Sequence, residues 1–299
     1  MQAIMLAAGE GTRCYPFTYL SPKITQEIGG IPLLEYMLSW FGGTPEIEKL
    51  YLVVRSGTTV EILNNYIQKR KPYLTKIVDL FGRLGYQVEY TNPNLKIEVI
   101  GVNGWGTGGD LRLAIKQITS VNKLGKDFLV CYADYVIVRK LPDEHFSPQL
   151  NLSDIITYHK NCTKVLNTVM TMALVTVERE AATRFGVAQL EEVKGFNLVR
   201  SFIEKPEVTD IPESPPISAG IYVMDSDFIL SNIDRLLPDK PNTDLSKTLL
   251  EHLAKDKRPK LAAYLLDLHA WFDVGMLEEL VDVNIYVASR KRGYIPQNK

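Results

Sequence analysis

An apolar run that ends in a glycine-rich, cationic turn constrains this chain more than any other feature. Residues 3–8 read Ala-Ile-Met-Leu-Ala-Ala, residues 9–13 read Gly-Glu-Gly-Thr-Arg, and Pro22-Lys23 follow. A short hydrophobic run that stops at glycines predicts a strand leading into a tight turn. Glycine lets backbone N–H groups approach an anion, while Arg13 and Lys23 add a forked donor and a point charge. The segment therefore predicts a binding loop for the phosphates of a nucleoside triphosphate.

Two common phosphate-binding loops do not match this segment. A Walker loop needs two glycines separated by four residues and followed by Lys and Ser or Thr, and no such run occurs here. The dinucleotide fingerprint needs a third glycine where Cys14 stands, which disfavours a dinucleotide-dependent oxidoreductase. Pro16 and Pro22 prevent a regular helix from starting directly after the turn. We therefore expect residues 12–23 to form an extended loop over the ligand, with a plain solvated loop as the alternative.

Composition limits the possible partners. A chain of 299 residues can bury about three quarters of its unfolded surface, which is enough for one large domain and an appendage. Hydrophobic residues make up 45% and charged residues 23%, which is ordinary for a globular protein. The formal net charge of −1 gives no general attraction to nucleic acid, so an anion site must be local. We expect no nucleic-acid partner.

The cysteines and the apolar runs indicate the compartment. The three cysteines, at positions 14, 131 and 162, are odd in number and lack metal-ligand spacing. A reducing, cytoplasmic location is the simplest interpretation. The N-terminal apolar run is too short for a signal peptide, and no apolar stretch of about 18 residues is present to span a membrane. We expect no membrane partner.

The chain alternates strand-like and helix-like segments. Strand-like runs recur at residues 50–54, 128–131, 154–157 and 168–175. Helical patterns lie at residues 33–40, 60–68 and 110–118. This alternation predicts an α/β fold, a Rossmann-like three-layer α/β/α arrangement with a mixed, mostly parallel sheet. Residues 187–190 and 201–203 are close enough in sequence to form an antiparallel pair.

The last part of the chain has a different pattern. Residues 210–216 are rich in Pro and Glu and predict a surface loop. From Thr243 onward the pattern is chiefly helical, with leucines at 245, 249, 250 and 253 on one apolar face. A final helix is expected over residues 277–289.

Two aspartates are candidate metal ligands. Asp134 follows the apolar run 128–131, so it is expected at the carboxyl end of a strand, where open α/β sheets bind ligands. Asp273 precedes Gly275, a small residue that lets the backbone turn beside it. Two carboxylates, completed by phosphate oxygens and water, suit Mg²⁺. The alternative is that each carboxylate only caps a local turn or helix.

These residues carry a resemblance to a known family. Residues 9–13, with Pro16, Thr18 and Pro22-Lys23, resemble the signature of the sugar-1-phosphate nucleotidyltransferases, also called nucleotide-sugar pyrophosphorylases. Further matches follow in the family's order, and the likeness covers residues 1 to about 285. They are Gly106-Thr107-Gly108-Gly109, Ala133-Asp134, Phe185-Gly186-Val187, Glu204-Lys205-Pro206, Ser218 to Tyr222 and Trp271 to Gly275.

The resemblance implies a reaction and a site. A sugar 1-phosphate attacks a nucleoside triphosphate and pyrophosphate leaves, with Arg13, Lys23 and Lys205 as catalytic residues. The nucleotide is expected at Ala8, Gly9, Gly11, Thr12, Gly106, Thr107 and Gly109. The sugar phosphate is expected at Asp134, Gly186, Glu204, Lys205 and Ser218, and Mg²⁺ at Asp134 and Asp273.

The resemblance also implies a division of the chain. A catalytic domain is expected over residues 1–240, with a nucleotide part over about residues 1–135 and a sugar-binding part over residues 136–240. Residues 241–299 would form a C-terminal helical segment that completes the domain and the metal site.

Substrate identity is only partly indicated. The run Leu6-Ala7-Ala8-Gly9 resembles uridylyl or thymidylyl enzymes, with a glucose-1-phosphate-like acceptor, whereas Ser218 replaces the family's asparagine. Serine is shorter and lacks the two amide donors, which leaves the sugar open. Two alternatives on the same fold also remain open: a phosphocholine-type cytidylyltransferase and a non-catalytic regulatory subunit. Assembly with identical copies is left open as well.

Overall fold

The structure is a computed structural model that describes residues 1–255 and 261–291. Parts of the expected C-terminal segment, residues 256–260 and 292–299, lie outside the described residues. The chain forms two compact units. The first unit contains Met1–Leu6, Val102–Cys131 and Ser153–Asp267, and the second contains Ala7–Gly101, Tyr132–Leu152 and Leu268–Lys299. The two units therefore interleave along the sequence, and the expected functional boundaries at residues 135 and 240 stay predictions.

A mixed sheet forms the centre of the first unit. Within the first unit, the strand order of this sheet is β10-β11-β13-β9-β12-β6-β1. The strands are β1 (Gln2–Ala7), β6 (Asp127–Tyr132), β9 (Met170–Thr176), β10 (Gly186–Val193), β11 (Phe196–Glu204), β12 (Pro216–Asp225) and β13 (Leu261–Leu265). Antiparallel pairs join β10 to β11, β11 to β13, and β12 to both β9 and β6, whereas β9 and β13 run parallel. This arrangement confirms an α/β fold with a mixed sheet.

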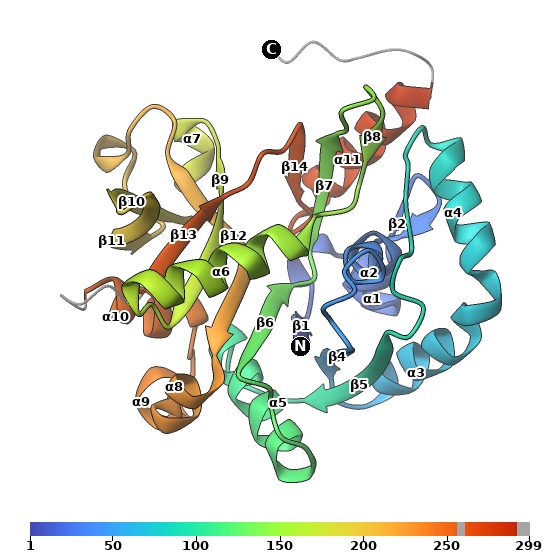
Figure 1. Cartoon of the computed structure of the whole chain (residues 1–299). Helices are drawn as coiled ribbons and strands as arrows, with labels where there is room; N and C mark the ends of the chain where they lie inside the picture. Colours follow the sequence, from blue (N-terminus) through green and yellow to red (C-terminus); the bar gives the residue numbers. More distant parts are fainter. Residues whose placement is uncertain (256–260, 292–299) are drawn as a thin grey trace. The chain divides into compact units, whose positions relative to one another are not determined.

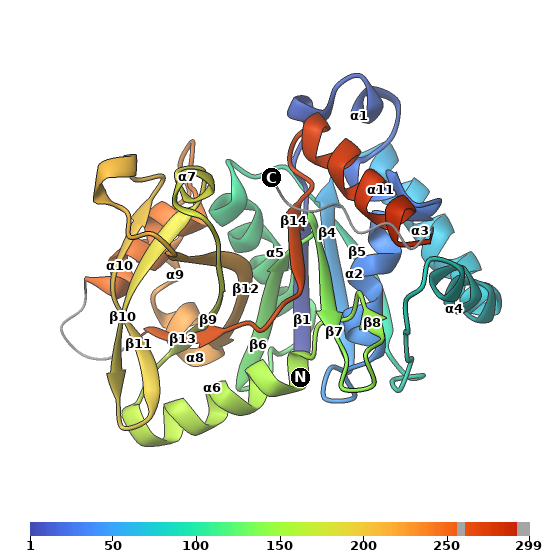
Figure 2. The ribbon, with the colours of Figure 1, turned by 90° about the horizontal axis from the view of Figure 1, so that it is seen from above.

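Helices cover both faces of this sheet (Figures 1 and 2). On one face lies α6 (Leu152–Leu166), whose buried Cys162 packs against Leu198 and Ala262 of the strands. On the other face lie α5 (Thr107–Val121) and α10 (Glu251–Ala254). The remaining helical elements are α7 (Arg179–Ala182), η4 (Val208–Asp210), α8 (Ser226–Ser231), α9 (Ile233–Leu236) and the π-helix η5 (Ser246–Leu250).

The second unit combines short sheets with longer helices. Its strands are β2 (Glu27–Ile28), β3 (Ile31–Pro32), β4 (Lys49–Arg55), β5 (Lys96–Val102), β7 (Tyr135–Lys140), β8 (Phe146–Ser147) and β14 (Ala270–Asp273). Its helices are η1 (Thr12–Cys14), α1 (Phe17–Leu20), η2 (Lys23–Thr25), α2 (Leu33–Gly42), α3 (Thr58–Arg70), η3 (Lys71–Tyr73), α4 (Leu74–Arg83) and α11 (Leu277–Lys291). Strands β4 and β5 are neighbours in a sheet, a small sheet has the strand order β14-β7-β8, and another pairs β2 with β3.

The C-terminal helix α11 packs into the core of the second unit. Its Val283 and Val287 belong to a buried apolar cluster with Phe81 of α4 and Val136 of β7. Asn284 anchors α11 to the β2–β3 turn, because its side-chain oxygen accepts a hydrogen bond from the Gly29 N–H at 2.9 Å. Helix α11 thereby holds the hairpin that follows Lys23 in the chain.

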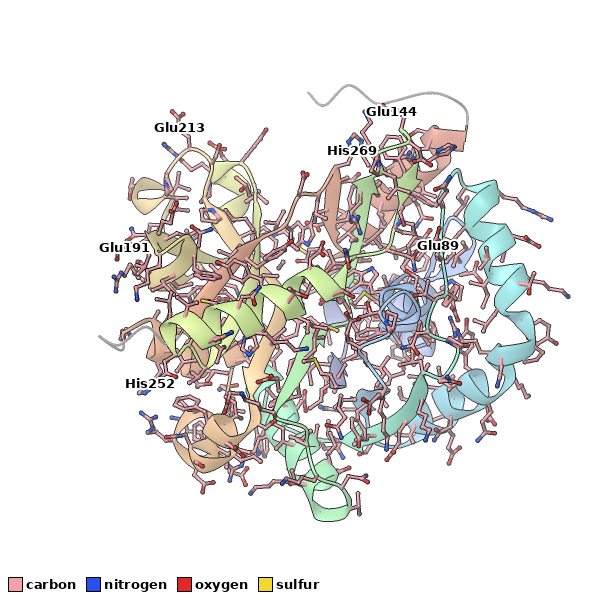
Figure 3. The ribbon with its side chains drawn as sticks, in the orientation of Figure 1. Glu89, Glu144, Glu191, Glu213, His252 and His269 are labelled. Atoms are coloured by element: carbon pink, nitrogen blue, oxygen red, sulfur yellow. The ribbon has the colours of Figure 1, made fainter. Side chains whose placement is uncertain are left out.

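Most of the predicted elements are present. The strands expected at residues 50–54, 128–131 and 168–175, and the antiparallel pair at 187–190 and 201–203, correspond to β4, β6, β9, β10 and β11. The helices expected at 33–40, 60–68, 110–118 and 277–289 correspond to α2, α3, α5 and α11. Figure 3 shows Glu213 projecting outward from the predicted loop over residues 210–216. No helix among the described residues is both long and apolar enough to cross a membrane.

Two sequence-based expectations were wrong. Residues 154–157 are not a strand but part of α6, because their buried apolar residues continue at helical spacing to Cys162. The described chain after Thr243 is chiefly helical, as expected, but the sequence did not predict β13 and β14, which join sheets of the first and the second unit. Residues 12–23 are not extended but form the short turns η1 and α1. Pro16 and Pro22 sit at N-cap positions, where a missing N–H costs nothing.

A buried ion pair links the helices of the second unit. Glu35 on α2 has a fully buried side chain, and the Arg70 guanidinium at the end of α3 donates to both of its oxygens at 2.6–2.8 Å. The Tyr66 hydroxyl donates to the same carboxylate at 2.8 Å, and Arg70 also donates to the Tyr90 hydroxyl at 3.1 Å. Each buried charge therefore has several partners, and removing one would leave the other without compensation.

We predict that Arg70→Met lowers the free energy of unfolding by about 3–5 kcal/mol, because it leaves the Glu35 carboxylate buried and unpaired. The double variant Glu35→Leu/Arg70→Met should recover much of that loss. Urea denaturation followed by circular dichroism measures both effects. Lys71→Met, at an exposed neighbouring position, is the matched control and should change stability by less than about 0.5 kcal/mol. A double variant as unstable as Arg70→Met would contradict this account.

Candidate functional site

The glycine-rich turn after β1 has a fixed backbone. Gly11 has a φ of +66°, and its carbonyl accepts hydrogen bonds from the Cys14 N–H at 2.8 Å and the Thr18 hydroxyl at 2.6 Å. A Cβ on Gly11 would lie 3.1 Å from Thr18 Cγ2, so a side chain there is opposed by both conformation and space. A Cβ on Gly9 would meet nothing within 4 Å, which leaves room for a ligand against the backbone.

The two predicted cations of this loop have different surroundings. Arg13 is exposed, and its guanidinium has no hydrogen-bond or carboxylate partner among the described residues. Lys23 is half-buried on η2, and its ammonium donates to Asp134 Oδ2 at 2.9 Å. The backbone that carries Lys23 is held by Thr25, whose hydroxyl donates to the Pro22 carbonyl at 2.7 Å.

The two predicted metal ligands come together through paired strands. Asp134 lies in the turn between β6 and β7, at the carboxyl end of β6 as expected. Asp273 is the last residue of β14, and the antiparallel register places it opposite Tyr135, the neighbour of Asp134. The Val274 N–H donates to the Asp134 carbonyl at 2.7 Å and so fixes the Asp273 turn against the Asp134 turn.

Gly275 leaves space for the Asp273 carboxylate. A Cβ on Gly275 would lie 2.8 Å from Asp273 Oδ1 and 3.2 Å from Oδ2. A side chain at this position would therefore displace the carboxylate. This is a stronger reason for glycine here than the backbone turn that the sequence suggested.

The buried Cys14 thiol lies among the four predicted charged groups. Its Sγ donates to the Val274 carbonyl at 4.0 Å, and burial raises the pKa of the thiol. The charges of Lys23 and Arg13 lower this pKa, whereas those of Asp273 and Asp134 raise it. The backbone of Val274 joins Cys14, the chain neighbour of Arg13, to the Asp134 turn, and Lys23 donates to Asp134, so the four groups come from segments that meet beside Cys14. Sequence analysis used Cys14 only to exclude a dinucleotide loop and missed this packing role.

The carboxylates fit a magnesium site. Asp134 Oδ1 is buried and has no hydrogen-bond partner among the described residues, so this anionic oxygen lacks a compensating donor. Hard oxygen donors from one or two carboxylates are what Mg²⁺ takes from proteins, together with phosphate oxygens and water. In the part of the chain that the structure describes, no group of three or more His, Cys, Asp or Glu could hold a metal. Further ligands would therefore have to come from substrate and water.

The predicted sugar-binding residues of the first unit lie at the ends of paired strands. Gly186, the first residue of β10, is opposite Glu204, the last residue of β11. A Cβ on Gly186 would lie 2.8 Å from Glu204 Oε2 and 2.0 Å from the Phe202 ring. Lys205 follows with a φ of +52°, and its N–H donates to the Phe185 carbonyl at 3.0 Å. The chain thus turns sharply where Glu204 and Lys205 present their side chains.

Glu204 is a perturbed acid. Burial raises the pKa of its carboxyl group, and the nearby negative charge of Asp244 raises it further. Lys205, a hydrogen bond from Ser246 and the charge of Lys247 act in the opposite direction. A partly desolvated carboxyl beside a second acid is typical of functional sites. Sequence analysis did not single out Asp244.

The Ser218 hydroxyl forms hydrogen bonds within the first unit. Its hydroxyl lies 2.9 Å from the Tyr222 hydroxyl and accepts a hydrogen bond from the Gly220 N–H at 3.3 Å. The side chain is buried at an irregularity in the pairing of β12 with β9. Its availability to a sugar is therefore lower than that of Glu204 and Lys205.

The second glycine-rich motif makes internal contacts. The N–H groups of Gly108 and Gly109 donate to the Thr243 carbonyl at 2.9 and 3.3 Å. The Thr107 hydroxyl accepts a hydrogen bond from the Leu245 N–H at 3.0 Å. A Cβ on Gly106 would lie 2.9 Å from the Thr243 carbonyl oxygen. These glycines thus fit α5 against the Thr243 loop, which the sequence did not reveal, and a nucleotide role for Gly106, Thr107 and Gly109 stays a prediction.

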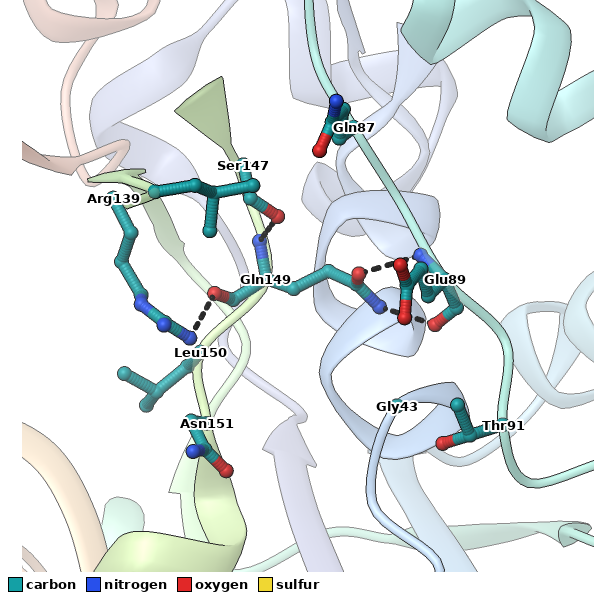
Figure 4. Close-up of a pocket in the computed structure, with 10 residues that line it drawn as sticks. Gly43, Gln87, Glu89, Thr91, Arg139, Ser147, Gln149, Leu150 and Asn151 are labelled. Atoms are coloured by element: carbon teal, nitrogen blue, oxygen red, sulfur yellow. Dashed lines mark hydrogen bonds between the residues drawn. The ribbon is translucent and has the colours of Figure 1, made fainter. Parts of the chain in front are cut away.

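A polar cavity of about 300 Å³ in the second unit contains none of the predicted site residues (Figure 4). Gln149 crosses it, accepting from the Glu89 N–H at 2.7 Å and donating to the Glu89 carbonyl at 2.8 Å. The Arg139 guanidinium donates to the Gln149 carbonyl at 3.3 Å. These hydrogen bonds tie backbone segments together, and we assign the cavity no catalytic role.

The chain is similar in sequence to curated proteins, one of which is a nucleotidylyltransferase according to its name. The chain is 28% identical over 295 residues to a bifunctional protein GlmU of Methanococcus vannielii, a match covering 96% of this chain and 55% of that protein. It is 26% identical over 285 residues to a bifunctional sugar-1-phosphate nucleotidylyltransferase/acetyltransferase of Sulfurisphaera tokodaii, covering 95% and 55%. The chain thus spans about half the length of these curated relatives.

A solved structure shares the fold. It is a UDP-glucose pyrophosphorylase in complex with UDP-glucose, with a TM-score of 0.71, 19% sequence identity, and coverage of 97% of this chain and 98% of that one. The family model described as nucleotidyl transferase matches residues 2–290. The resemblance read from the motifs is therefore confirmed, and the chain belongs to the nucleotidyl transferase family.

Proposed function

We propose that this protein transfers a nucleotidyl group from a nucleoside triphosphate to a sugar 1-phosphate and releases pyrophosphate. The observation that carries the proposal is the arrangement beside the glycine turn: Lys23 donates to Asp134 at 2.9 Å, and the backbone of Val274, next to Asp273, joins the Asp134 turn to Cys14, next to Arg13. Two cations and two carboxylates suit a reaction between polyanions that depends on a divalent cation. The family membership supports the same class of chemistry.

The bond changes follow from the substrates. A phosphate oxygen of the sugar 1-phosphate attacks the α-phosphorus of the nucleotide, forming a new P–O bond as the bond to the pyrophosphate oxygen breaks. The attacking phosphate is already ionised, so no side chain has to remove a proton. When bound at Asp134 and Asp273, Mg²⁺ would neutralise charge on both phosphates that must approach each other. Such displacements ask the protein mainly for positioning and charge neutralisation.

The side chains of the second unit supply that positioning. Arg13 and the N–H groups of Gly9, Gly11 and Thr12 would hold the β- and γ-phosphates, and Ala8 would lie beside the nucleoside. Lys23 would stabilise the charge that develops at the α-phosphate. A unit charge pair at about 4 Å is worth on the order of 4 kcal/mol near a protein surface, so each cation matters for the rate.

The strand ends of the first unit would bind the sugar phosphate. Lys205 is exposed and its ammonium has no hydrogen-bond or ion-pair partner among the described residues, so this ammonium is available to a phosphate. Glu204 would accept hydrogen bonds from sugar hydroxyls, with Gly186 leaving room for its carboxylate. Ser218 remains a weaker candidate because its hydroxyl is already bonded to Tyr222.

We further propose uridylyl or thymidylyl transfer to a glucose-1-phosphate-like acceptor. The run Leu6-Ala7-Ala8-Gly9 supports this choice, and a neighbour of the same fold was solved with UDP-glucose. The three cysteines are free and buried, which supports a reducing cytoplasmic location. A phosphocholine-type cytidylyltransferase is the second candidate, favoured only by the exposed Trp105, whose ring could contact a quaternary ammonium.

We expect pyrophosphate release only with a sugar 1-phosphate, Mg²⁺ and UTP or dTTP. The test is a matrix of five nucleoside triphosphates against several sugar 1-phosphates and phosphocholine, read by a coupled pyrophosphate assay. Release with phosphocholine and CTP alone would move the protein to the alkyl-phosphate class. If a folded protein that still binds nucleotide released no pyrophosphate with any substrate pair, the result would identify a non-catalytic subunit.

Single substitutions should separate catalysis from folding. Lys23→Ala should lower kcat by about 10²- to 10³-fold, because it removes a cation that acts on the transition state. Asp134→Asn should abolish metal-dependent turnover. Glu10→Gln, in the same loop but facing Arg55 at 2.5 Å, is the matched control and should keep most of the activity. Steady-state kinetics and thermal melting check these expectations, and near-wild-type rates in either active-site variant would refute the assignment.

Glu204→Gln should stabilise the protein while reducing its activity. The pKa of Glu204 is raised in the folded state, so folding opposes its ionisation. The ionised Glu204 carboxylate lowers the free energy of unfolding. This loss of stability is absent at pH values below the pKa of Glu204 in the unfolded chain, and it reaches its full size above the pKa in the folded protein. The thermal midpoint of Glu204→Gln should therefore exceed that of the wild type by about 2 °C at pH 8, and the gain should vanish near pH 4. Glu207→Gln, at an exposed position, should show no such pH dependence.

A further inference from the structure

The ammonium of Lys23 is bonded to the carboxylate that we assign to the metal. The Lys23 Nζ lies 2.9 Å from Asp134 Oδ2, and the two side chains are only 17% and 28% exposed. Two cations close to one carboxylate repel each other, most strongly where solvent screening is reduced. A divalent cation at Asp134 and this ion pair are therefore in competition.

The Asp134 carboxylate has an oxygen that could bind a divalent cation. Its second oxygen, Oδ1, is buried without a hydrogen-bond donor among the described residues, so Lys23 satisfies only half of the carboxylate. The main chain at this point is held independently, because the Asp134 carbonyl accepts from the Val274 N–H at 2.7 Å. The carboxylate can thus change its partner without a change of the backbone.

Lys23 is able to move away without unfolding its own segment. The Lys23 carbonyl accepts a hydrogen bond from the Gln26 N–H at 3.0 Å, and the Thr25 hydroxyl donates to the Pro22 carbonyl at 2.7 Å. These hydrogen bonds of the η2 turn do not involve the ammonium and would stay in place when it moves. The ammonium, by contrast, stands at the end of a flexible four-carbon stem, and among the described residues it donates a hydrogen bond only to Asp134. A swing of this stem is enough to break the pair.

We propose that a divalent cation displaces Lys23 from Asp134 and that the released ammonium then becomes available to the substrate phosphate. Before displacement, Lys23 neutralises Asp134 and keeps the carboxylate ordered. After displacement, repulsion from the new cation directs the ammonium away from Asp134. The inference rests on the proposed function, since it uses the same carboxylate and the same lysine. It adds an order of events, in which occupation of Asp134 precedes the action of Lys23.

The first test measures Mn²⁺ binding to the full chain without substrate, from the electron paramagnetic resonance signal of free Mn²⁺. Lys23→Met should bind Mn²⁺ about five- to tenfold more tightly than the wild type, because the competing ammonium is gone. Arg13→Met is the matched control: it removes a cation near Cys14 that is not paired with Asp134, and should change affinity less than about twofold. Equal affinities in wild type and Lys23→Met, absence of binding in both, or an equal gain in Arg13→Met would overturn the proposal.

The second test follows the lysine itself. Acetic anhydride labels free amines, and mass spectrometry reports the labelled fraction of Lys23 relative to the exposed Lys240. Labelling of Lys23 should rise several-fold when Mn²⁺ is added to the wild type. In Asp134→Asn it should be high from the start and insensitive to Mn²⁺. Labelling that does not respond to Mn²⁺ in the wild type would refute the exchange.

These readouts separate the inference from the proposed function. Both use protein without nucleotide or sugar, so an exchange can be found in a protein that transfers nothing. Conversely, if the protein is an active transferase but labelling of Lys23 does not change with Mn²⁺, the proposed function stands and the proposed displacement of Lys23 is wrong.

Discussion

The antiparallel pairing of β7 with β14 is the constraint on which the candidate site depends. It places Asp273 opposite Tyr135, directly beside Asp134, although the two aspartates are far apart in the sequence. The backbone of Val274 then serves both neighbours, because its N–H donates to the Asp134 carbonyl and its carbonyl accepts from the Cys14 thiol. Three segments that each carry part of the charged group are thereby connected through the backbone of one residue. Helix α11, which begins shortly after, packs this arrangement into the core of the second unit.

In two places, a glycine leaves the space that a carboxylate of the predicted site occupies. Gly275 leaves the space that Asp273 occupies, and Gly186 leaves the space for Glu204, since a Cβ on either glycine would come within 2.8 Å of a carboxylate oxygen. A carboxylate that fills the place of a missing side chain has few other rotamers available to it. Gly275 and Asp273 belong to one motif, whereas Gly186 and Glu204 belong to two motifs that the pairing of β10 with β11 brings together. The Gly106–Gly109 motif differs, because its small residues admit the backbone of Thr243.

The sequence predicted what depends on neighbouring residues and missed what depends on tertiary pairing. The turn at Gly11, and Asp134 and Glu204 at strand ends, follow from local patterns of apolar and small residues. Residues 154–157 were misassigned because Ile155 and Ile156 form a short apolar run, and only the continuation through Cys162 reveals a helical period. The Glu35–Arg70 pair, the Thr243 contacts and strand β13 depend on partners distant in the chain, and a single sequence does not disclose them.

Lys205 has a backbone conformation that its residue type disfavours. At a φ of +52° a residue other than glycine or asparagine costs about 1 kcal/mol or more. The turn itself does not need lysine, because the hydrogen bond from its N–H to the Phe185 carbonyl would form equally well with glycine. What glycine would lose is the ammonium and the direction that this unusual backbone gives it. The fold therefore accepts a local loss of stability at the turn that places a positive charge at the end of β11.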